Sequence, residues 1–262
     1  MEATQSGQGV RHLKAVVAET GHRPWPMPDR PWNMTQTWSE LLFAHYPVRP
    51  EELRPLIPPS LPLDLFDGDA WVGVVPFRMS YVRPRLLPAV PGLSFFPELN
   101  VRTYVTVNGK PGVYFFSLEA ANPIAVWIAR RLFKLPYFNA RMSCQRTDNH
   151  VRYSSNRTHR GAPTASFKAR YRPTGPVFHS SSGSLEHWFT ERYALYSVGA
   201  DGTVFRGEIH LQPWPLQPAE LNLEMNTMLS THGVRPALSE PLLHYTDRIK
   251  VVVWSIERVQ ST

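Results

Sequence analysis

The segment from residue 96 to residue 142 constrains the fold more than any other part of the chain, and in its first strand polar side chains recur at every second position. They are Glu98, Asn100, Arg102 and Tyr104, with apolar residues and one threonine between them. A period of two is that of a β-strand, so the pattern predicts a strand with one polar face. Asn108-Gly109 then predicts a hairpin turn, since both residues tolerate positive φ.

A helix is predicted directly after the returning strand. Asn122 can cap its first turn and Pro123 suits its first position, while Pro136 ends it after about Leu135. Its large apolar residues recur at helical spacing, and Arg131 falls among them.

Arg131 would be buried if that apolar stripe faces the core. A buried guanidinium requires a carboxylate partner, and Glu98 and Glu119 are the nearest acids in the predicted sheet. Two interpretations follow from this pairing. The arginine forms either a structural ion pair between helix and sheet or the charged floor of a pocket.

The rest of the chain consists mainly of alternating segments. Residues 1–31 lack apolar periodicity and end in four closely spaced prolines, which predicts a flexible N-terminal tail before a single domain at 32–262. We expect nine or ten strands and three short helices in that domain. This is an α+β fold, predominantly an antiparallel sheet that is curled or closed into a β-barrel.

Composition limits the function classes. The net charge of +7 resides largely on single cations along alternating strands, without a nucleic-acid-binding motif, so a solvated basic face is favoured over a polyanion site. No long apolar run or signal segment is present, and there is one cysteine. We therefore expect a cytoplasmic protein without a nucleic-acid or membrane partner; a homo-oligomer stays open, although no assembly motif argues for one.

Signature motifs for metals and nucleotides are absent. The ten histidines have no metal-ligand spacing, and no glycine-rich phosphate loop or nucleophile elbow occurs. We expect no metal and no cofactor, so any chemistry would come from ordinary side chains in a cavity.

Several phrases of the sequence resemble the YqjF-like family of bacterial proteins. They include LFAHYPV (42–48), DLFDGDAWVGVVPFRM (64–79), FPELNVRTYV (96–105), GKPGVYFFSLEA (109–120), ARRLFKLPYFNARM (129–142), TERYALY (190–196) and HLQPWPLQPAE (210–220). This family is grouped with the acetoacetate decarboxylase-like fold, a largely antiparallel closed sheet with an interior cavity. The resemblance thus implies a barrel with an internal site.

The decarboxylase mechanism is not implied, because its lysine pair is missing. The decarboxylases carry two adjacent lysines after the helix, whereas this chain reads Leu135-Pro136-Tyr137-Phe138 there. None of the five lysines adjoins another, so Schiff-base catalysis lacks the neighbouring cation that activates the amine.

A carboxylate mechanism remains. By resemblance, Glu98 corresponds to a cavity glutamate of the decarboxylases, and Arg102 or Arg131 could stabilise an anionic oxygen. The predicted substrate-binding residues are His45, Asn100, Tyr104, Glu119, Tyr137, Phe138, His210 and Trp214. Each of the histidines and aromatic residues among them also fits an ordinary core position.

Two functions are consistent with such a site. The first is a cofactor-independent lyase, isomerase or cyclase that acts on a small carbonyl or polyketide-like compound; it requires Glu98 to project into an enclosed chamber, with a guanidinium within reach. The alternative is a non-catalytic carrier or sensor of a small hydrophobic ligand in the same pocket. A basic interaction protein is a third, weaker interpretation.

Overall fold

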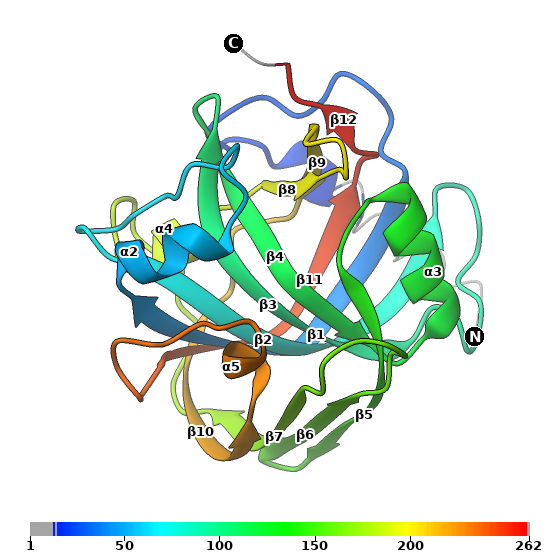
Figure 1. Ribbon diagram of the computed structural model, residues 1–262. Coiled ribbons are helices and arrows are strands. Elements are labelled where there is room, and N and C mark those ends of the chain that lie inside the picture. Colours follow the sequence, from blue (N-terminus) through cyan, green and yellow to red (C-terminus); the bar gives the residue numbers. More distant parts are fainter. Residues whose placement is uncertain (1–12, 14, 261–262) are drawn as a thin grey trace.

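The computed structural model describes residues 13 and 15–260, and its main element is a curled sheet of twelve strands (Figure 1). The sheet order is β12-β9-β8-β4-β3-β2-β1-β11-β10-β7-β6-β5, and neighbours in this order are antiparallel except β4 with β8; the additional pairing of β4 with β5 is also parallel. The strands are β1 (Met34–Val48), β2 (Ala70–Pro84), β3 (Phe96–Val107), β4 (Lys110–Ala120), β5 (Tyr137–Thr147), β6 (His150–Arg157), β7 (Ser166–Pro173), β8 (Ala194–Val198), β9 (Val204–His210), β10 (Gln217–Asn226), β11 (Leu242–Val253) and β12 (Glu257–Arg258).

Short helices connect these strands. They are α2 (Pro50–Leu53), which continues into a 3₁₀ turn (Arg54–Leu56), α3 (Pro123–Leu132), α4 (Leu185–Thr190) and α5 (Met228–Thr231). The α+β class is confirmed, and the sheet is curled rather than closed into a barrel. Two short additional pairings, β9 with β11 and β4 with β5, draw distant strands together. No described helix is long and apolar enough to cross a membrane.

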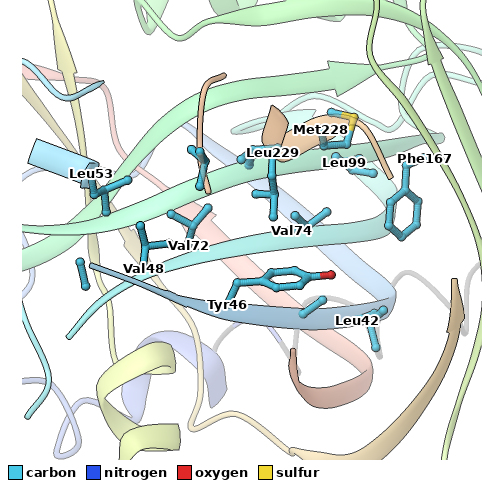
Figure 2. Packing of buried hydrophobic residues seen from close by; sticks show 14 of the residues in the cluster. Leu42, Tyr46, Val48, Leu53, Val72, Val74, Leu99, Phe167, Met228 and Leu229 are labelled. Carbon is cyan, nitrogen blue, oxygen red and sulfur yellow. The ribbon is translucent and has the colours of Figure 1, made fainter. Parts of the chain in front are cut away.

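Both faces of the central strands are buried. One face packs against β6, β7 and the residues of α2 and α5, and Figure 2 shows part of this cluster, with Tyr46, Val74, Leu99 and Phe167 among its labelled members. The opposite face packs against aromatic residues from α4, β5 and the segment that follows β9. A polar side chain on either face of β3 is therefore enclosed by protein.

A bulge in β1 determines which of its residues face the aromatic cluster on this opposite face, which we call the second cluster. Glu40 has a φ of 53°, and the register with β2 shifts between Ser39 and Ala44. This shift reverses which side chains point to each face of the sheet. Trp38, at an even position, and Phe43, at an odd one, therefore both contact Trp214.

The described part of the predicted tail contacts the sheet. Val16 is buried, and Arg23 and Trp25 each donate a hydrogen bond to Glu208 of β9, at 3.1 and 2.9 Å. Residues 1–12 and residue 14 lie outside the described residues. The start of the domain at residue 32 remains a prediction.

Candidate functional site

The alternating polar residues of β3 lie on one face of the strand, as predicted, and this face is buried. Glu98, Asn100, Arg102 and Tyr104 are each less than 10% exposed. β3 lies between β2 and β4 in the sheet, where Glu98 pairs with Phe77 and Ala120, and Arg102 pairs with Gly73 and Phe115. The aromatic residues of the second cluster pack over these side chains. The face is therefore a row of polar groups inside an apolar sheet.

Glu98 lies at one end of this row and has a single neutral side-chain partner. The Tyr137 hydroxyl donates to Glu98 Oε2 at 3.0 Å, and the Glu98 backbone carbonyl accepts from the Tyr153 hydroxyl at 2.6 Å. Burial raises the pKa of Glu98 to about 8, and the Tyr137 hydrogen bond offsets only part of this rise. Glu98 is thus a neutral acid over most of the physiological pH range.

Arg102, His45 and Tyr104 form a second group on the same face. The Tyr104 hydroxyl lies 2.7 Å from His45 Nε2, and the Arg102 guanidinium lies 5.3 Å from the Phe43 ring centre. The His45 ring stacks on Phe189 with 3.7 Å between centroids. Burial and the nearby Arg102 hold the pKa of His45 well below its ordinary value, so the imidazole is neutral.

Gly73 allows this group to assemble. It pairs with both His45 and Arg102 across β2. A Cβ at this position would lie 3.1 Å from His45 Cδ2 and 3.6 Å from Arg102 Cγ. A side chain here would press on the imidazole, which is a reason for glycine in an otherwise apolar strand.

Four buried polar atoms on this face have no hydrogen-bond partner among the described residues. They are His45 Nδ1, Trp71 Nε1, Asn100 Oδ1 and Arg102 Nε. They come from β1, β2 and β3, which are consecutive in the sheet. An unsatisfied buried donor or acceptor costs about 1–3 kcal/mol, so four of them on consecutive strands distinguish this face from the rest of the core.

Glu119 lies on the opposite face, and its partner is Arg157 rather than Arg131. Arg157 Nε donates to Glu119 Oε1 at 2.9 Å, and both side chains are buried. Phe138 covers this pair, with the Arg157 guanidinium 4.1 Å from its ring centre. In β6 every second residue faces inward, namely Val151, Tyr153 and Ser155. Arg157 continues this alternation, so its burial could have been predicted from the sequence.

The prediction that Arg131 is buried is wrong. Arg131 is exposed, with its guanidinium 4.9 Å from the exposed Trp127 ring. The helix buries Val126 and packs Ala125 and Ala129 against the sheet, because small residues allow close approach; the large apolar residues face outward. No contact joins Arg131 to Glu98, and no guanidinium forms an ion pair with Glu98 among the described residues.

His210 and Trp214 lie away from Glu98. His210 Nε2 is 2.8 Å from the Val16 carbonyl, so the N-terminal segment covers it. Trp214 lines a cleft of about 1690 Å³ and also contacts Phe43, with 5.0 Å between ring centroids. The other predicted site residues do not line this cleft. The structure therefore separates the predicted residues into the β3 face, the Glu119–Arg157 pair and these outlying positions.

Buried residues that the sequence analysis did not name also belong to the site. Trp71 and Gly73 belong to β2, the strand next to β3. Arg192 approaches Tyr104, with its guanidinium 5.2 Å from the ring centre, while paired with Asp64. In the described part of the chain, no group of three histidine, cysteine or acidic side chains is arranged to hold a metal ion.

Comparisons with known proteins agree with this fold. Residues 35–250 match the DUF2071 family, described as an uncharacterized conserved protein. Uncharacterized protein YqjF of Bacillus subtilis is 44% identical over 232 residues, which cover 88% of this chain and 95% of YqjF. These matches confirm the resemblance found in the sequence.

Solved structures with a similar fold are much more distant in sequence. Acetoacetate decarboxylase from Legionella pneumophila has a TM-score of 0.58 at 13% identity, covering 94% of this chain and 95% of its own. The enduracididine biosynthesis enzyme MppR, complexed with pyruvate, has a TM-score of 0.60 at 12% identity over 90% and 93% of the two chains. An acetoacetate decarboxylase-like enzyme from Sphingomonas wittichii RW1 has a TM-score of 0.58 at 14% identity over 93% and 100%.

At these identities the structural matches show a shared fold alone. The match over residues 35–250 and the relative at 44% identity, in contrast, show which sequence family the protein belongs to. The chain belongs to the DUF2071 family.

Proposed function

We propose that this protein is a cofactor-independent enzyme that acts on a small anionic carbonyl compound at the polar face of β3. Arg102 would hold the anionic or enolate oxygen, and Glu98 would exchange a proton with the reacting carbon. The observation that carries this proposal is the set of unpartnered buried atoms on β1, β2 and β3. A ligand with carbonyl and carboxylate oxygens would satisfy donors such as Arg102 Nε and Trp71 Nε1.

The distance between Glu98 and Arg102 sets the length that a ligand would need. Glu98 and Arg102 are four residues apart on one strand, so their Cα atoms are about 14 Å apart. Asn100 lies between them on the same face, so a ligand that contacts both side chains would be centred over it. The substrate must therefore extend along β3, with its anionic group toward Arg102 and its reactive carbon toward Glu98.

The protonation states suit proton transfer. With a pKa raised to about 8, Glu98 can donate a proton to a carbanion or enolate, and its ionised form can take a proton from a carbon next to a carbonyl. The buried guanidinium would stabilise the oxygen that gains charge as this proton leaves. Support by analogy comes from MppR, which has a similar fold and is complexed with pyruvate, a small 2-oxo acid.

The test measures binding and proton exchange separately. Wild-type protein would be incubated in D₂O with a panel of 2-oxo and 3-oxo acids, and ¹H NMR would follow loss of the C–H signal next to the carbonyl. We expect Glu98→Gln to lower the exchange rate at least 100-fold with little change in Kd, and Arg102→Met to raise Kd at least tenfold. Glu240→Gln, an exposed acid, serves as the control.

Native mass spectrometry of freshly purified protein adds an independent readout, because a retained molecule identifies the ligand class. The proposal fails if Glu98→Gln exchanges protons at the wild-type rate. It also fails if wild-type protein binds no member of the panel and carries no retained small molecule.

A second candidate is a carrier or sensor of a hydrophobic ligand. It is favoured by the cleft of about 1690 Å³, which Trp214 lines and Glu98 does not. Such a protein would retain a ligand and show no exchange in D₂O. In that case Glu98→Gln would leave ligand binding unchanged, whereas Trp214→Ala would weaken it.

A further inference from the structure

Large exposed apolar side chains are concentrated in two segments of this protein. Of the sixteen among the described residues, ten lie in the stretch 81–95 or in α3. Leu86 is 89% exposed, Trp127 59% and Leu132 64%. The others in these segments are Tyr81, Leu87, Val90, Leu93, Phe95, Ile124 and Ile128. Such clustering on a surface marks an interaction site more often than scattered apolar residues do.

The two segments are joined to each other. The Asn122 side chain, which caps α3, donates to the carbonyls of Gly92 and Leu93 at 3.3 and 3.1 Å. The backbone N–H of Ala121 donates to the Pro97 carbonyl at 3.3 Å. Figure 1 shows α3 beside the loop that connects β2 to β3. We call residues 81–95 and α3 together the α3–loop surface.

All charged residues of this surface and its immediate flanks are cations. Residues 80–96 contain Arg83 and Arg85, residues 123–135 contain Arg130, Arg131 and Lys134, and neither range contains an aspartate or glutamate. Arg85, Arg130, Arg131 and Lys134 are exposed. The partner of this surface should therefore combine an apolar phase with negative charge.

We propose that the α3–loop surface docks this protein onto an anionic lipid bilayer. The apolar side chains would enter the boundary between headgroups and acyl chains, with Trp127 at headgroup depth, while the cations contact lipid phosphates. Arg131 already lies alongside the Trp127 ring, so its stem can follow the apolar face while its guanidinium stays at the surface. This binding is peripheral, and it would add a membrane partner that the sequence did not lead us to expect.

A second copy of the chain fits the surface less well. A symmetric dimer would place this patch against itself, and the four cations of each α3–loop surface would lie near the four of the other copy, without an acid in either segment. Like-charge contacts of this kind disfavour association. A bilayer rich in anionic lipid offers negative charge and an apolar interior together.

The test is co-sedimentation of full-length protein with vesicles. Vesicles of phosphatidylcholine alone would be compared with vesicles containing 40% phosphatidylglycerol, at low and high salt. We expect binding to the anionic vesicles that is at least tenfold stronger than to neutral ones, and that weakens with salt because the headgroup attraction is screened.

Matched variants locate the contact. Trp127→Ser with Leu132→Ser, and separately Arg131→Gln with Lys134→Gln, should each lower the partition coefficient at least tenfold. The apolar control is Val177→Ser with Leu238→Ser, which removes equally exposed side chains elsewhere. The charge control is Arg152→Gln with Arg170→Gln, on β6 and β7. Both controls should bind like the wild type, and circular dichroism would verify that all variants are folded.

Three results would overturn the proposal. The first is equal sedimentation with anionic and neutral vesicles, and the second is unchanged binding by both surface variants. The third is a concentration-dependent dimer in analytical ultracentrifugation that Trp127→Ser with Leu132→Ser abolishes, because the surface would then be an interface between copies. None of these results bears on Glu98, so this inference and the proposed enzyme can fail separately.

Discussion

At the scale of single residues, Glu98 is distinguished by the lack of an ion-pair partner among the described residues. Its carboxyl group is buried beside the Tyr137 hydroxyl. A carboxyl group in such surroundings keeps its proton, whereas the same group in the unfolded chain ionises near 4.5. Glu98 should therefore make the stability of the protein depend on pH.

Glu98→Gln provides the measurement. The folded state binds the proton more tightly than the unfolded state, so the contribution of Glu98 to stability is fully present below pH 4.5 and is lost as pH rises to about 8. We expect wild-type stability, relative to the Gln variant, to fall across this window by up to about 5 kcal/mol. Urea unfolding at several pH values measures the difference. A constant difference would mean that the carboxyl group is ionised in the folded protein.

The Glu119–Arg157 pair differs from Glu98 because each charge has a partner; burial still raises the pKa of Glu119, and the adjacent Arg157 opposes that rise. Arg157→Met would leave the Glu119 carboxylate buried and unpaired, and we expect a loss of about 3–5 kcal/mol in the free energy of unfolding. The double variant Glu119→Leu with Arg157→Met should recover much of this loss, since no unpaired charge remains. Lys168→Met, at an exposed ion pair, is the control and should change stability little. Equal losses in the single and double variants would contradict this account.

At the scale of elements, α3 depends on its cap. Asn122 Oδ1 accepts from the backbone N–H groups of Ile124 and Ala125, and its amide nitrogen donates to the loop at Gly92 and Leu93. Asn122→Ala should cost about 1–2 kcal/mol in the free energy of unfolding and should also loosen the loop. Trypsin would then cleave after Arg85 faster than in the wild type. Ser184→Ala, which removes the α4 cap, is the control because Ser184 has no bond to this loop. Unchanged cleavage in Asn122→Ala would show that the cap does not hold the loop.

Local rules predicted some of these elements correctly. Asn108-Gly109 forms the hairpin with φ values of 50° and 70°, and Asn122 and Pro123 start α3. The polar face of β3 was also predictable, because alternation depends only on strand geometry. These features rest on contacts between residues that are close in sequence.

The surroundings of α3 and β1 could not be predicted in the same way. Periodicity assigns Trp127 to the core because it is large and apolar, but the sheet accommodates Val126 and the small residues Ala125 and Ala129 instead. The bulge at Glu40, which brings Trp38 and Phe43 to one face, has no glycine to signal its positive φ. Both outcomes depend on partners that are distant in sequence.

At the scale of the whole molecule, the two apolar clusters share their strands. β1, β2, β3, β4 and β11 contribute residues to both, one cluster on each face of the sheet. Unfolding of either cluster would expose the backs of the strands that support the other. The fold therefore has two hydrophobic cores that share the same strands.

We therefore predict that residues 32–262 unfold in one cooperative transition. Tryptophan fluorescence reports mainly on the second cluster and its surroundings, where Trp38, Trp71, Trp188 and Trp214 lie, whereas far-ultraviolet circular dichroism reports on all strands. In urea the two signals should give the same midpoint and the same slope. If fluorescence changed before the dichroism signal, the aromatic cluster would be able to open while the sheet persists, and β1 to β4 would not couple the two faces. Such an opening would expose Glu98 and Arg102 to solvent without global unfolding, so coincident transitions also support a site that stays enclosed in the native state.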